Sequence, residues 1–520
     1  MLRRARTQSG IVAQTLSLIL CAKGNLGAAM QNAWSRLATA AFLAMLPVSF
    51  AAADDDWKTC ADASGEVAIA ACSSAIGSGR YQGKDLSVLY YNRGVEYQNK
   101  GDNDRALADY NMAIDFDPKN ANPYNGRGNV YNDKGDNDRA LADYNKAIEL
   151  DPKNANPYNG RGNVYHDKGD NDRALADFNK AIELDPKYAG AYNGRGNAYS
   201  DKGDSDRALA EYNKAIEIDP NYTYAYRNRG LLYVNKADYD RAVIDCTKAI
   251  ELNPKYVSAY NDRGRAYYGK KDYDRAIADY EKVVELDPKA AYAQRNLGLA
   301  HMRKGDYDRA IAGYNKAIEL DPKFTDAYDD RGSAYRAKGD NERALADYNK
   351  AIEIDPKNKW PYLNRGRMNL YTGAISKALA DLNQARELDP KFAYTALWLD
   401  IAGKRSNLPS RLGEATTQID MTKWPAPVIR LFLGQLTPDA MLAAADNPNP
   451  ETKSEQVCEA NFYSGELALQ QGKRSEAARL FKLAAAECPK TFIEYDGANA
   501  EIKALEGTSL MQWFLSLFKK

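Results

Sequence analysis

Small and apolar residues recur at helical spacing through most of the chain, separated by short polar stretches. Residues 121–154 show the pattern, with Tyr, Gly or Ala at positions 4, 8, 11, 20, 24 and 27 of the stretch. Positions 4, 8 and 11 lie three or four residues apart, as do 20, 24 and 27, so the pattern predicts two helices that each bury one face. Gly135 favours the end of the first helix, one of residues 136–138 is expected to cap the second, and Pro152 ends it.

This stretch recurs with a period of 34 residues. Proline at position 32 marks nine successive units, at Pro118, Pro152, Pro186, Pro220, Pro254, Pro288, Pro322, Pro356 and Pro390. The period, with its order of large residue, Gly, aromatic, Ala, aromatic, Ala and Pro, resembles the tetratricopeptide repeat (TPR) family. The resemblance implies an all-α fold, a right-handed superhelical solenoid of helix-turn-helix repeats, with nine repeats over residues 87–392. Such a solenoid grows by adding one repeat to the next, so the number of domains cannot be inferred from the length of 520 residues.

Position 7 departs from the family pattern, which has Leu there. Eight units carry Arg instead, and only Leu297 keeps the pattern. The arginines are Arg93, Arg127, Arg161, Arg195, Arg229, Arg263, Arg331 and Arg365. We interpret them as structural side chains whose aliphatic stems cover apolar surface while the charged ends reach water.

Composition excludes several classes of function. Lys plus Arg and Asp plus Glu both number 71, and the two signs alternate without a basic stripe, which argues against nucleic-acid binding. The two histidines lie in different units, which argues against a histidine-based catalytic or zinc centre. Acidic pairs such as Asp136 and Asp138 recur in nearly every unit, so helix capping explains them better than catalysis. We therefore expect no enzymatic activity, no cofactor and no metal.

Residues 1–53 contain two stretches that are typical of export signals. The second begins at Met30, places Arg36 before a short apolar core, and ends in three alanines that suit cleavage after Ala53. Met30 is therefore a candidate for the true start of the protein. An exported chain reaches an oxidising compartment, where disulfides persist.

Four cysteines are expected to form two disulfides. Residues 54–86 read as a truncated helical unit, in which Cys60 on a short first helix would face Cys72 on the second. Cys458 and Cys488 hold positions 1 and 31 of a terminal unit, where the start of one helix lies beside the end of the next. Cys246 takes the place of an aromatic residue at position 24 and is read as a small core residue.

The concave surface of a TPR solenoid is formed mainly by first-helix positions 2, 5, 9, 12 and 13, as the family resemblance implies. In repeats two to four these positions carry an amide ladder that could bind an extended peptide backbone, namely Asn125, Asn129, Asn159, Asn163, Asn193 and Asn197. An alternative is that Asn is a tolerated polar filler in a recently duplicated repeat. From repeat five on, the surface changes to Tyr224, Arg227, Arg265, Tyr268, Tyr292, Arg295, Arg303 and Arg336. We expect the arginines and tyrosines to concentrate ligand binding there and to favour acidic peptides.

The period is lost after residue 392. Residues 393–456 keep irregular helical fragments, residues 457–507 form a terminal unit with a capping helix, and residues 508–520 form a hydrophobic tail that either caps the last helices or contacts a partner or a membrane. Residues 395–507 are similar to the C-terminal part of a Gram-negative TPR lipoprotein that acts as an adaptor for cell-wall hydrolases and a protease. That resemblance implies a periplasmic or otherwise exported location and protein partners of this kind.

The sequence therefore favours a non-enzymatic, exported scaffold of the cell envelope that holds peptide segments or partner proteins in its concave groove. The alternative is a structural or self-assembling envelope protein without a dedicated peptide ligand.

Overall fold

The computed structural model describes residues 56–490 and 492–517, and within these ranges every regular element is helical. For residues 508–517 it describes the backbone alone. The export signal expected over residues 1–53 and the last residues of the tail lie outside the described part. The chain divides into two compact units, Met1–Ala225 and Tyr226–Lys520, and each is described by itself below.

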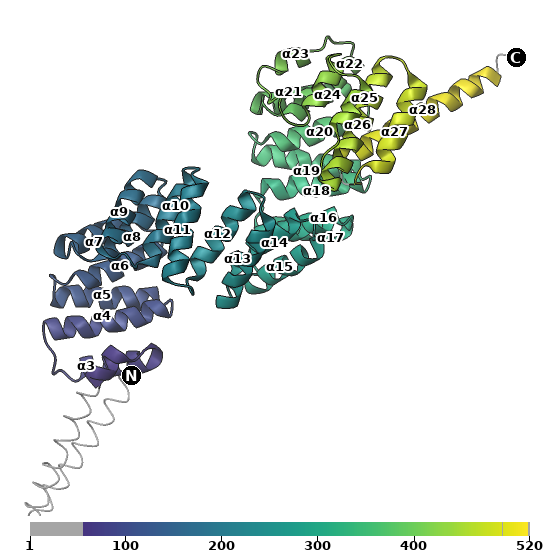
Figure 1. Cartoon of the computed structure of the whole chain (residues 1–520). Helices are drawn as coiled ribbons and strands as arrows, with labels where there is room; N and C mark the ends of the chain where they lie inside the picture. Colours follow the sequence, from purple (N-terminus) through teal and green to yellow (C-terminus); the bar gives the residue numbers. More distant parts are fainter. Residues whose placement is uncertain (1–55, 491, 518–520) are drawn as a thin grey trace, which may run out of the picture. The chain divides into compact units, whose positions relative to one another are not determined.

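The first unit starts with the truncated pair expected from the sequence. Residues 56–62 form a short helix that carries Cys60, and Cys72 on the next helix is disulfide-bonded to it. Regular helix pairs follow (Figure 1). The helix with Cys72 is α3 Gly65–Gly77, and the pairs that follow it are α4 Lys84–Asn99, α5 Asn103–Phe116, α6 Ala121–Asp133, α7 Asn137–Leu150, α8 Ala155–Asp167, α9 Asn171–Leu184, α10 Ala189–Asp201 and α11 Ser205–Ile218.

The second unit continues the pairs and ends in a longer helical module. Helix α12, Thr223–Asn235, spans the boundary between the units. The repeat helices that follow are α13 Tyr239–Leu252, α14 Val257–Gly269, α15 Tyr273–Leu286, α16 Ala291–Arg303, α17 Tyr307–Leu320, α18 Thr325–Ala337, α19 Asn341–Ile354, α20 Lys359–Tyr371 and α21 Ile375–Leu388. The C-terminal module contains α22 Ala393–Arg405, α23 Leu412–Ala415, α24 Ala426–Phe432, α25 Pro438–Ala444, α26 Pro450–Gln470, α27 Arg474–Glu487 and α28 Ile493–Leu517.

The signals that begin and end each repeat helix act as the sequence predicts. Gly135 has a φ of 76°, which suits glycine, and it directly follows the C-cap of α6. Asp136 is the N-cap of α7, and its carboxylate accepts a hydrogen bond from the backbone N–H of Arg139 at 3.1 Å. Helix α7 ends at Leu150, two residues before Pro152. The same arrangement recurs in the neighbouring repeats.

In the first three repeats, the core of each pair is an aromatic ring held between two glycines. A Cβ atom built on Gly128 would lie 2.9 Å from the ring of Tyr144, and one built on Gly160 of the next repeat would lie 2.6 Å from it. Real Cβ atoms do not pack this closely, so the ring needs glycine on both sides. Cys246 replaces the aromatic residue in repeat five and is fully buried there, as its interpretation as a core residue requires.

The position-7 arginines are structural, as expected, but their charged ends are held mainly by carboxylates of the chain and have only limited contact with water. Arg161 shows the arrangement: its Nε and Nη2 donate two parallel hydrogen bonds to the carboxylate of Asp177, at 2.8 and 2.7 Å. We call this bidentate ion pair a fork. Arg161 Nη1 also donates to Asn145 of the preceding repeat at 2.6 Å. The same fork to the position-23 aspartate forms in seven of the eight described cases, at Arg93, Arg127, Arg161, Arg229, Arg263, Arg331 and Arg365. A bidentate Arg–carboxylate pair satisfies both charges away from water, so it replaces the leucine of the family pattern.

The C-terminal module packs on the first helices of the last repeats. Arg336 of α18 forms an ion pair with Asp496 of α28. Within the module, Arg405 of α22 donates to Glu466 of α26 at 2.9 Å and to Glu501 of α28 at 2.6 Å. Helix α28 approaches closely at Gly497, where an added Cβ would lie 2.5 Å from the hydroxyl of Tyr371. The disulfide expected between Cys458 and Cys488 is present and joins α26 to the end of α27. Helix α28 also continues through residues 508–517, where the sequence predicted a separate tail.

Candidate functional site

The amide ladder of the first unit lines an open hollow of about 440 Å³. Its walls come from the first helices of three successive repeats, because positions 5 and 9 of α6 and α8 face the same side. Four of the predicted asparagines lie here, Asn125, Asn129, Asn159 and Asn163, together with Gln98, Asn132, Asp133, Asn156 and Tyr188. The other two, Asn193 and Asn197, follow on α10, outside the lining of this hollow.

Several acceptor atoms of the hollow have no protein partner among the described residues. The Oδ1 atoms of Asn125, Asn132 and Asn159 are shielded from solvent and accept no hydrogen bond within the described chain. Burial raises the pKa of Tyr188, and the Asn159 side chain offsets this only in part. Burial also raises the pKa of Asp133 at the edge of the hollow. The surface is therefore polar and nearly uncharged, and it can accept hydrogen bonds that the chain does not supply.

The arginines predicted to bind acidic ligands in the second unit are engaged within the protein. Arg227 forms an ion pair with the buried carboxylate of Asp262 at 2.7 Å, and Arg265 lies 3.5 Å from the same carboxylate. Tyr292 of α16 is partly exposed, and Tyr224 belongs to the first unit.

The remaining arginines of this surface follow the same rule. Arg295 contacts Asp330 at 2.6 Å, Arg303 donates to the hydroxyl of Tyr268 at 3.0 Å, and Arg336 is paired with Asp496. An acidic ligand would have to compete with these partners. The expectation that it binds here stays a prediction.

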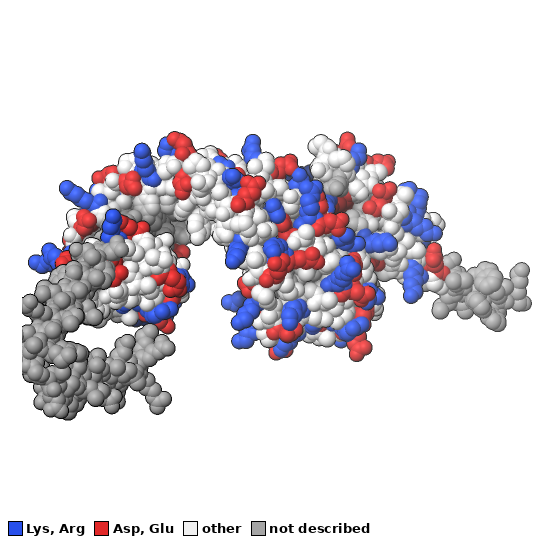
Figure 2. Space-filling model, turned by 90° about the horizontal axis from the view of Figure 1, so that it is seen from below, with Lys and Arg blue, Asp and Glu red and all other residues white. Residues whose placement is uncertain are grey.

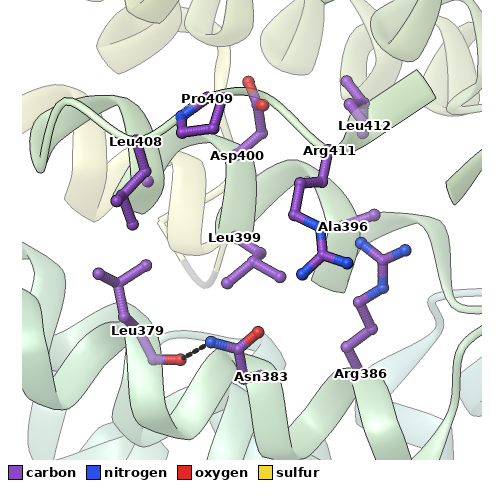
Figure 3. A pocket seen from close by; sticks show the side chains of 11 residues that line it. Leu379, Asn383, Arg386, Ala396, Leu399, Asp400, Leu408, Pro409, Arg411 and Leu412 are labelled. Atoms are coloured by element: carbon purple, nitrogen blue, oxygen red, sulfur yellow. Dashed lines mark hydrogen bonds between the residues drawn. The ribbon is translucent and has the colours of Figure 1, made fainter. Parts of the chain in front are cut away.

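A second hollow of about 300 Å³ lies where the repeat period ends, and sequence reasoning missed it. Figure 3 shows the guanidinium groups of Arg386 and Arg411 near each other on one side of this hollow, with Leu399 in the middle of the view and Leu379 on the opposite side. In repeats two, three, four, eight and nine the position-7 arginine donates to the asparagine at position 25 of the preceding repeat. Here position 7 is Leu399, and Nδ2 of Asn383 donates instead to the carbonyl of Leu379 at 2.8 Å. The sequence signal that could have located this hollow is Leu399, which replaces the position-7 arginine in the first unit after the nine repeats.

The charges of the surface are mixed. Figure 2 shows Lys and Arg interspersed with Asp and Glu over the face in view, without a patch of one sign. In the described ranges no group of three or more His, Cys, Asp or Glu side chains is placed to hold a metal ion. Within the same ranges, no helix combines the length and apolar character that a membrane span needs.

Sequence-family comparisons match the repeats directly. A model described as TPR repeat matches residues 128–169, 162–203, 196–236 and 332–371. Models described as tetratricopeptide repeat match residues 227–291 and 261–323, 87–120, and 314–346. Together the matches cover more than half of the chain. The chain belongs to the tetratricopeptide repeat family. TPR proteins are generally binding scaffolds rather than catalysts, and the observed solenoid of helix pairs agrees with this membership.

Solved TPR structures resemble parts of this TPR chain. MamA is 30% identical over 31% of this chain and 95% of its own, with a TM-score of 0.30. YrrB, described as a TPR protein with an unusual peptide-binding site, is 29% identical over 35% of this chain and 95% of its own, with a TM-score of 0.31. A TPR protein from Parabacteroides merdae is 22% identical over 48% of this chain and 98% of its own, with a TM-score of 0.41.

Proposed function

We propose that this TPR protein is an exported scaffold of the cell envelope that holds an extended segment of a partner protein against the amide surface of repeats two to four. The observation that carries the proposal is the set of solvent-shielded Oδ1 atoms of Asn125, Asn132 and Asn159, which have no partner among the described residues. A buried acceptor without a hydrogen bond costs about 1–3 kcal/mol, and rotation of the amide toward the N–H of a bound peptide would remove that cost.

The amide surface suits a peptide better than the arginine surface of the second unit. A carboxamide offers an acceptor and a donor side by side, which matches the N–H and C=O of a peptide unit. By contrast, Arg227, Arg295 and Arg336 already bind carboxylates of the chain itself, so a ligand there gains only the difference between two ion pairs.

The two disulfides support an exported location, because such bonds persist in oxidising compartments. The similarity of residues 395–507 to an adaptor of cell-wall hydrolases suggests envelope enzymes, either such hydrolases or a protease, as the partners.

Crosslinking capture from the protein's own envelope fraction tests the proposal. Arginine at both Asn125 and Asn159 would fill the hollow with two charged side chains, so we expect the N125R/N159R variant to lose the partner captured by the wild type. A control adds one arginine, half of that charge, at Met112, which is exposed on α5, the second helix of its repeat. The M112R variant should capture normally. Equal capture by N125R/N159R and wild type would overturn the proposal, and capture of further copies of the chain alone would favour self-assembly.

A further inference from the structure

The amide at position 9 is normally held by a tyrosine of its own repeat. The hydroxyl of Tyr144 donates to Asn129 Oδ1 at 2.7 Å in repeat two, and that of Tyr212 donates to Asn197 Oδ1 at 2.8 Å in repeat four. Both tyrosines stand at position 24. In these two repeats the acceptor oxygen of the amide is therefore occupied from within the protein.

Repeat three lacks this bond because position 24 is Phe178. The ring of Phe178 is fully buried and packs on the position-8 glycine of its own repeat, as Tyr144 does in repeat two. A Cβ atom built on Gly162 would lie 2.8 Å from the Phe178 ring, and one built on Gly128 would lie 2.9 Å from the Tyr144 ring. The ring position is thus preserved and the hydroxyl alone is missing. Asn163, at position 9 of this repeat, has no hydrogen-bond partner among the described residues.

Asn163 lies next to other unused acceptors. It shares α8 with Asn159, one turn away, and both line the hollow together with Asn125 of the preceding repeat. The Oδ1 atoms of Asn159 and Asn125, like that of Asn132, accept no hydrogen bond among the described residues. Unused acceptors therefore lie on both α6 and α8, and repeat three differs from repeats two and four in that its position-9 amide is not held by a tyrosine.

We infer that Phe178 makes repeat three the anchoring point for an extended, uncharged peptide segment. Asn163 Oδ1 accepts from a backbone N–H of the peptide, and its Nδ2 donates to a backbone carbonyl. Burial raises the pKa of Asp133, the carboxyl group at the edge of the hollow, so the site disfavours charge. This inference rests on the proposed function and adds to it the residue that sets where the peptide binds.

Exchanging one hydroxyl tests the inference in both directions. Phe178→Tyr would supply the donor that occupies Asn163, whereas Tyr144→Phe would remove the donor that occupies Asn129. The probe is the tightest binder to the wild-type mature protein from an array of uncharged, N-acetylated and C-amidated 12-residue peptides, measured in solution by fluorescence anisotropy. We expect F178Y to bind about tenfold more weakly and Y144F a few-fold more tightly, because one hydrogen bond to the ligand is lost or gained.

The substitutions are mild, since Tyr is the natural residue in repeats two and four, and thermal unfolding of F178Y will verify the fold. Probes that carry one N-methylated peptide bond, placed at each position in turn, should bind F178Y and wild type with equal affinity when the methyl group replaces the N–H that Asn163 accepts. Equal affinity of F178Y and wild type would overturn the inference. So would a hollow that binds oligosaccharides but no array peptide. If N125R/N159R still loses its captured partner while F178Y captures it normally, the scaffold function stands and the role of Phe178 falls.

Discussion

The ion pair between Arg161 and Asp177 allows a sharp test of what holds each repeat together. Asp177 is 6% exposed and accepts two hydrogen bonds from Arg161, whose own side chain is 20% exposed. Asp177→Ala would leave the guanidinium largely buried without its counter-ion. Breaking such a pair costs about 3–5 kcal/mol when both groups are fully buried. Because Arg161 keeps a bond to Asn145 and some contact with water, we expect about 2–4 kcal/mol here.

Native-state hydrogen exchange is the suitable assay, because a repeat array opens in parts and a single unfolding free energy is not well defined for it. In D177A, the free energy of opening measured at the amides of α8 and α9 should fall by about 2–4 kcal/mol, while the amides of α3 to α5 change little. The control is Asp172→Ala, which removes a carboxylate that is 85% exposed and pairs with Lys202 on the surface. Surface pairs contribute about 0–1 kcal/mol. Equal loss of protection in D177A and D172A would refute the view that the fork is a major contributor.

Two further predictions concern the C-terminal module. Burial, with a contribution from Glu494, raises the pKa of Glu459 to about 8, so the stability that Glu459 contributes is complete below about pH 4.5 and is lost as the pH rises through 8. The stability of wild type relative to the E459Q variant should therefore fall between pH 5 and 9. Denaturation midpoints of the two proteins that stay parallel over this range would contradict the prediction. The Cys458–Cys488 disulfide closes a loop with a sequence separation of 30, which in the chain-entropy model contributes about 3–4 kcal/mol to stability. Mass spectrometry without reductant should find no free thiol at either position. The C458A/C488A variant should show faster amide hydrogen exchange in α26 and α27.

Local signals predicted the repeats well because each repeat carries its own start, stop and core residues. The N-cap at Asp136, the glycine at 135 and the buried ring of Tyr144 act over a few residues, so spacing alone located them. The disulfides followed from the same geometry, since repeat positions place the two ends of a hairpin together.

The partners of the arginines were harder to predict, because they depend on which side chain of a neighbouring helix faces each one. Arg336 pairs with Asp496, which lies 160 residues further on in a region without the repeat period, and no spacing rule reaches that far. The position-7 arginines were different, since a signal was present. Position 23 of the same repeat is acidic wherever position 7 is Arg, and this correlation was the clue to the forks.

Repeat seven shows how the fork can be replaced. It carries Leu297 at position 7 and Gly313 at position 23, so both members of the pair change together. A Cβ on Gly313 would lie 2.9 Å from the carbonyl oxygen of Gln294 and 3.1 Å from Gly298 Cα, so the backbones of α16 and α17 leave no room for a side chain at position 23. Replacing a buried pair as a whole by apolar contact is often neutral, whereas removing one partner is costly. The fork is therefore one of two solutions to the same packing problem. The forks hold the position-7 charges within the protein, and this supports the proposal that the neutral amide surface is where a partner finds hydrogen-bonding capacity.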